Sequence, residues 1–145
     1  MNKRTMGGVL AFWVLVAWGC SGFEDPTPEN VFFTVDGPAG AQVLAIYSTQ
    51  FVAGVDEFGT TGVTIFKSDT VLHTLPIDTT MNIAIDRQWV VVLQSVGDQG
   101  FSVEAIVDVD DRNVARQTGG ILPGEPWSFV YMFNRRLTNT IEVII

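Results

Sequence analysis

The densest group of potential metal ligands in this 145-residue chain is formed by Asp108, Asp110, Asp111 and Asn113. Calcium takes roughly six to eight oxygen ligands, and an EF-hand loop places acids at positions one, three and five and a glutamate at twelve. Counted from Asp108, Arg112 occupies the fifth position and a glycine the twelfth, so the EF-hand pattern fails. We interpret the cluster as a solvated hairpin tip, with a surface calcium site as the alternative, and we predict no bound metal or cofactor.

Residues for nucleophilic or acid–base catalysis are sparse. His73 is the only histidine, and neither Ser48 nor Ser68 lies in the Gly-x-Ser-x-Gly turn of many serine hydrolases. One histidine and one cysteine also make too few ligands for a usual zinc site. Carboxylates that could pair for glycoside hydrolysis occur in 56–57 and 78–86, but their separation cannot be known from sequence. The sequence therefore predicts a non-catalytic protein.

The N-terminus has the pattern of a secretory signal. Lys3 and Arg4 precede the uncharged segment 7–19, and small residues follow it. Residues 17–20 (AWGC) resemble a bacterial lipobox, in which the cysteine becomes diacylated and N-terminal. Because Cys20 is the only cysteine and ends the apolar run, we predict that it carries lipid. The alternatives are an uncleaved signal anchor and a cleavage that leaves Cys20 as a free thiol.

These features predict where the protein is and how it is divided. The cationic start stays on the cytoplasmic side, so the remainder lies in the extracytoplasmic envelope, on the periplasmic side or at the outer membrane. We expect a signal peptide over 1–19, the lipidated cysteine and a proline-containing linker over 20–30, and one domain over 31–145. The net charge of −8 argues against a nucleic-acid partner, because phosphate binding needs a basic surface.

Beyond the linker the hydrophobic pattern repeats every two residues, which indicates β-strands. We read 51–62 and 119–126 as loops and 67–69 as a turn or bulge, because glycine and polar residues gather there. The predicted fold is all-β, a single antiparallel β-sandwich of Ig-like or transthyretin-like architecture with about seven to nine strands. The strands are expected over 31–35, 42–48, 63–66, 70–75, 81–86, 88–96, 101–109, 114–118, 127–133 and 137–145.

One strand carries an aromatic stripe followed by two arginines. Exposed aromatic residues concentrate binding energy, so the stripe is a candidate partner or ligand face, with a role in the core as the alternative. The apolar end of the chain, 142–145, is either an edge that another chain could extend or a central strand. The candidate face consists of Trp127, Phe129, Tyr131, Phe133, Arg135 and Arg136.

Several short segments make the domain similar to the soluble part of the mycobacterial membrane protein small (MmpS) family. They are VFFTVDG (31–37), VLAIYS (43–48), VLHTLP (71–76), and 89–94 followed by 101–114. The resemblance implies a small extracytoplasmic β-sandwich that assists a lipid transporter of the resistance-nodulation-division type. This chain departs from the family in having a lipobox in place of a membrane-spanning helix and no cysteine pair in the domain.

The sequence thus predicts a lipid-anchored envelope protein that acts as an accessory or scaffolding subunit of a membrane complex. The resemblance implies that this is a transport complex. Its expected partners are the membrane, through lipid on Cys20, and a membrane protein. One alternative is a module that binds a small ligand or lipid in a pocket lined by Trp89, Phe101 and Trp127. A second alternative is a cell-surface adhesion domain.

Overall fold

The computed structural model describes residues 27–55, 61–133 and 141–144. For Val55, Thr61 and 141–144 it describes the backbone only. These residues form nine strands and no helix. The strands are β1 (Asn30–Asp36), β2 (Gln42–Val55), β3 (Thr61–Thr74), β4 (Ile77–Asn82), β5 (Gln88–Ser95), β6 (Phe101–Val109), β7 (Arg112–Ile121), β8 (Trp127–Met132) and β9 (Ile141–Ile144).

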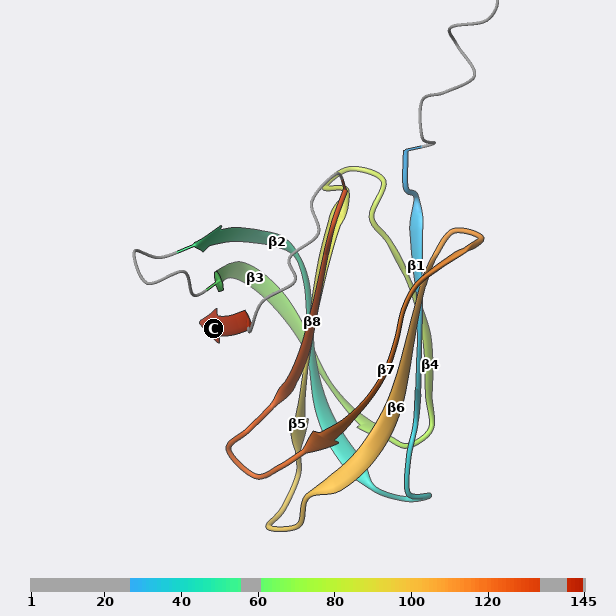
Figure 1. Cartoon of the computed structure of the whole chain (residues 1–145), viewed down its shortest axis with the longest axis vertical. Coiled ribbons are helices and arrows are strands. Elements are labelled where there is room, and N and C mark those ends of the chain that lie inside the picture. The colour runs from blue at the N-terminus through green and yellow to red at the C-terminus, as the bar shows by residue number, and fades with distance from the viewer. Residues whose placement is uncertain (1–26, 56–60, 134–140, 145) are drawn as a thin grey trace, which may run out of the picture.

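The strands form two sheets that pack face to face, which confirms the predicted β-sandwich (Figure 1). One sheet has the order β4-β1-β6-β7 and the other β8-β5-β2-β3-β9. Every pairing is antiparallel except that of β9 with β3, where Thr61 to Thr64 run parallel to Ile141 to Ile144. A parallel pair requires a long crossover connection, and here the connection contains β4 to β8.

The main core fills the space between the sheets. Alternate residues of β1 and β6 point inward, so that Val31, Phe33 and Val35 face this core while Phe32 is exposed. Period-two alternation of this kind is what a half-buried strand requires. The β1 and β6 strands therefore lie close to where the sequence places them.

The hairpin of β2 and β3 extends beyond the sandwich and forms an arm. The two strands pair as far as Val55 and Thr61, and both bend at irregularities between Tyr47 and Phe51 (Figure 1). A second, smaller core lies here and contains residues from the arm and from the outward face of β5. Its buried members are Ile46, Phe51, Val63, Val90, Val92 and Val130.

Two parts of the sequence prediction are wrong in this region. The segment 51–62 is not simply a loop, because β2 continues to Val55, β3 begins at Thr61, and Phe51 buries its side chain in the second core. The separate strands expected over 63–66 and 70–75 are one continuous β3. The expected irregularity at 67–69 is confirmed as a bulge, which inserts extra residues and bends the hairpin.

Two other boundaries differ from the prediction. The strand expected over 81–86 begins earlier, at Ile77, and ends at Asn82, after which Arg87 has a positive φ of 53° and its N–H bonds to the Ile83 carbonyl. The apolar Ile83, which suggested a strand, is buried in this turn. The loop expected over 119–126 starts late, because β7 continues to Ile121 and pairs with Phe101.

Candidate functional site

The Asp108–Asn113 cluster is a structural turn. Asp110 has a positive φ of 51°, and its carboxylate accepts hydrogen bonds from the backbone N–H groups of Glu29 (3.3 Å) and Asn30 (2.9 Å). Asp108 accepts a hydrogen bond from the Asn113 side-chain amide at 2.7 Å. In the described part of the chain, no three metal-ligating side chains gather into a site. Asp110 instead fixes the point at which the chain enters β1.

The other candidates for chemistry are separated. His73 Nε2 lies 3.1 Å from the Tyr47 hydroxyl, with the two rings edge to face. Ser48 donates its hydroxyl to the Lys67 carbonyl, and Asp86 accepts the Thr49 hydroxyl, both at 2.5 Å. These groups hold neighbouring segments together and do not form a nucleophile–base pair. Residues 56 and 57 lie outside the described residues.

Burial of Tyr47 predicts a specific alkaline response. It raises the pKa of the Tyr47 phenol to about 12, whereas an unfolded tyrosine titrates near 10. The folded state therefore holds this proton more tightly, and the resulting stability is complete below about pH 10 and lost as the pH rises toward 12. Because solvent screens part of the effect, we expect the wild type to lose roughly 1–2 kcal/mol more unfolding free energy than Tyr47→Phe over that interval.

Urea titrations of both proteins at about pH 9 and 11.5 measure this difference. Phe32→Leu is the control, because it changes an exposed ring on β1 without removing a titrating group, and it should show the wild-type loss. An equal alkaline loss in Tyr47→Phe and wild type would contradict the assignment.

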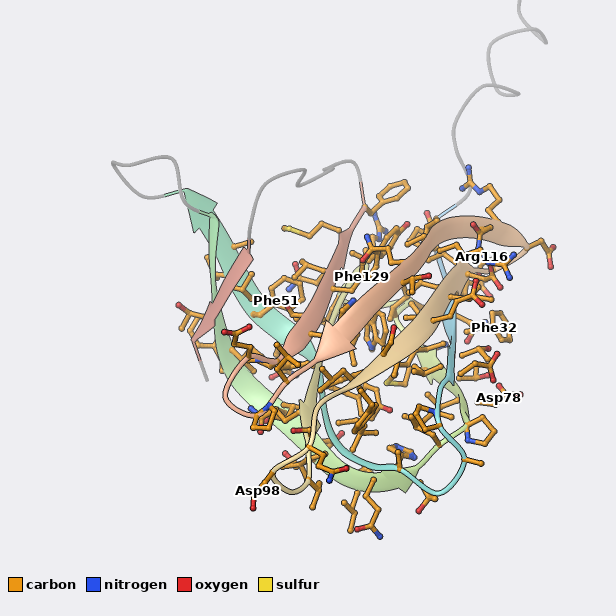
Figure 2. All side chains as sticks on the ribbon, turned by 60° about the horizontal axis from the view of Figure 1, so that its bottom comes forward. Phe32, Phe51, Asp78, Asp98, Arg116 and Phe129 are labelled. Atoms are coloured by element: carbon orange, nitrogen blue, oxygen red, sulfur yellow. The ribbon has the colours of Figure 1, made fainter. Side chains whose placement is uncertain are left out.

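The aromatic stripe of β8 packs toward the main core. Trp127, Phe129 and Tyr131 are half-buried, and all three pack against the buried residues between the sheets. The Trp127 ring stacks on Phe33 and on Phe129, with centroids 6.2 and 6.4 Å apart. Figure 2 shows Phe129 in the region between β8 and β7. Because Trp127, Phe129 and Tyr131 are each only partly exposed, only part of each ring is accessible to a partner.

Trp127 also explains the glycine at its side. A Cβ on Gly119 would lie 2.8 Å from Trp127 Cδ1, so the ring occupies space that a larger residue on β7 would fill. Phe133, at the end of the stripe, is half-buried and donates its N–H to the Arg87 carbonyl. Arg135, Arg136 and Cys20 lie outside the described residues, so the partner-face and lipidation hypotheses stay predictions.

A pocket that the sequence did not predict lies at the bend of the arm. It has a volume of about 250 Å³ and lies between β3 and β4, which are edges of different sheets at this point. The only sequence signal for it was the break in apolar alternation at 67–69. It is lined by Tyr47, Ser48, Thr49, Gln50, Lys67, Ser68, Asp69, Met81 and Asn82.

Beside the pocket, β3 has an open edge. On that side β9 pairs only with Thr61 to Thr64, so the described structure leaves β3 from Ile65 to Thr74 without a strand there. This stretch exposes large apolar side chains, with Phe66 and Leu72 69% and 56% exposed. Unpaired N–H and C=O groups beside exposed apolar side chains form a template for another strand.

No protein-family model, curated protein or solved structure matches this chain. Within the ranges that the structure describes, no helix is long and apolar enough to cross a membrane.

Proposed function

We propose that this protein is a non-catalytic, lipid-anchored scaffolding subunit of a membrane complex in the bacterial envelope. Lipid on Cys20 holds it at the bilayer, residues 21–30 set its reach, and the open edge of β3 pairs with an extended segment of a membrane-protein partner. Strand addition of this kind takes its affinity from backbone hydrogen bonds and its specificity from alternate side chains. The open edge is the observation that supports the proposal.

The two edges of the β4-β1-β6-β7 sheet suit a partner less well. β4 is short, and its outward positions include the exposed polar residues Asp78 and Thr80. β7 carries Arg112 and Arg116, and Arg116 pairs with Glu104 at 2.6 Å. Charged side chains on an edge strand hinder pairing with another chain. From Thr70 to Thr74, β3 bears no acid, arginine or lysine.

The test is purification from native membranes in mild detergent, with a tag inserted in the Gly97–Gly100 turn. We expect a stoichiometric membrane protein with the wild type, and a yield of it at least about tenfold lower with the double variant Val71→Lys, Leu72→Lys, because two charges block the edge. Both residues are exposed, so the fold should persist. Ile85→Lys is the control, because Ile85 is apolar and 91% exposed but lies in the turn after β4.

A partner retained by the double variant would reject the edge as the contact. Purification without a stoichiometric partner would reject the scaffolding role. The anchor is tested in the same cells by labelling with a radioactive fatty acid, which the wild type should incorporate and Cys20→Ser should not.

A further inference from the structure

We propose that the pocket at the bend of β2 and β3 binds a small zwitterion, a molecule that carries a primary ammonium and an anionic group a few bonds apart. The volume of about 250 Å³ would hold about eight water molecules, which suits one small ligand. The inference goes beyond the scaffolding role and does not depend on it, because soluble probes can test it.

The walls of the pocket are fixed before any ligand arrives. The Ser48 hydroxyl, which is buried, donates to the Lys67 carbonyl and accepts from the Gln50 N–H at 2.9 Å. The Gln88 side-chain amide donates to the carbonyls of Thr49 and Phe51, both at 2.9 Å. These hydrogen bonds hold the irregular segment 48–51 of β2 in place without a ligand. Because the site is preformed, less conformational entropy is lost when a ligand binds.

Two opposite charges on the rim remain available. Lys67 and Asp69 both line the pocket and are exposed, and neither makes an ion pair or a side-chain hydrogen bond with another described residue. They stand on either side of Ser68 without pairing with each other. Alternate residues of a strand point to the same side, which is how an ammonium and a carboxylate come to share this rim.

This charge pattern selects the ligand class. A ligand with one charge would meet one attractive and one repulsive group, whereas a zwitterion can place its anionic group at Lys67 and its ammonium at Asp69. Asn82 adds an uncharged hydrogen-bonding group at the rim. A divalent metal is disfavoured, because the described residues bring no three metal-ligating side chains together.

The pocket lies at the end of the sandwich where the linker enters. Asn82 is the register partner of Asn30, and its side-chain amide donates to the Asn30 side-chain oxygen at 3.3 Å. The zwitterion can therefore come from either of two sources, a free amino acid or the phosphoethanolamine headgroup of a lipid near the anchor. The two share the chemistry that Lys67 and Asp69 recognise.

Saturation-transfer NMR on the full chain in maltoside detergent tests the proposal, with millimolar alanine and glycerophosphoethanolamine as probes. We expect transfer to at least one probe, and an affinity about fivefold lower in Asp69→Asn and in Lys67→Gln, since one exposed ion pair is removed. Asp98→Asn is the matched control, because Asp98 lies in the β5–β6 turn and does not line the pocket (Figure 2). Both pocket residues are exposed, so melting temperatures should stay unchanged.

Transfer to alanine supports the free amino acid, and transfer to glycerophosphoethanolamine supports the headgroup. Propionate and ethylamine each lack one charge and should bind about fivefold more weakly than alanine or glycerophosphoethanolamine. The proposal is overturned by transfer to neither zwitterion, by equal affinity of the single-charge analogues, by stronger binding of methyl glucoside, or by unchanged binding in both pocket variants.

Discussion

Replacing Trp89 by alanine is expected to lower the free energy of unfolding by about 3–5 kcal/mol, because a large core side chain is lost and a cavity is left. Trp89 is fully buried and lies at the centre of the aromatic cluster, 5.2 Å from the Phe33 ring and 6.4 Å from those of Tyr47 and Phe129. Its indole N–H also bonds to the Met81 sulfur at 3.4 Å. Tyr47 also makes three ring contacts and a hydrogen bond, but Trp89 is the larger and more deeply buried of the two side chains.

Urea unfolding followed by circular dichroism measures this loss. Trp89→Phe keeps a ring in the cluster and gives a folded reference if the alanine variant is too unstable to study. Phe32→Ala is the matched control on β1, since Phe32 is exposed, and it should cost less than about 1 kcal/mol. Equal losses for Trp89→Ala and Phe32→Ala would contradict the central position of Trp89.

Replacing Val92 by aspartate is expected to cost about 3–5 kcal/mol, because it places an unpaired charge in a buried site. Val92 points away from the main core, and in a simple sandwich that direction leads to solvent. Here Val92 is 0% exposed and belongs to the second core under the arm. The substitution thus tests whether the arm packs on the outer face of its own sheet.

Thr80→Asp is the control for this charge. Thr80 is an exposed strand residue on β4, and the same substitution there should change the unfolding free energy by no more than about 0.5–1 kcal/mol. A similarly small loss for Val92→Asp would mean that water reaches Val92 and that the arm does not cover it.

The sequence was most informative where one face of a strand meets the core and the other meets water. The sequence pattern therefore predicted β1 and β6 close to their observed bounds. β5 shows the limit of this reasoning, because Val90 to Leu93 are buried on both faces and alternation disappears. Burial of the outer face depends on the arm, which is distant in sequence, and local periodicity carries no information about it.

The candidate site was harder to predict for a related reason. The pocket brings residues of β2, β3 and β4 together across a bulge, and register shifts of this kind depend on side-chain support such as the bonds from Gln88. The sequence did indicate an irregularity near Ser68. The acidic turn was the stronger signal in the sequence, but there the Asp110 carboxylate binds backbone N–H groups where the chain enters β1.

The position of β1 has a mechanical consequence. This first strand lies inside its sheet, hydrogen-bonded to β4 on one side and to β6 on the other. Tension applied at the N-terminal end of β1 acts along the strand axis. The backbone hydrogen bonds to β4 and to β6 are then loaded in shear, so many of them must break at the same time. β9, by contrast, is held at an edge by four residue pairs and can be unzipped one pair at a time. A domain of this design would resist force applied at its N-terminal end and would yield first at its C-terminal strand.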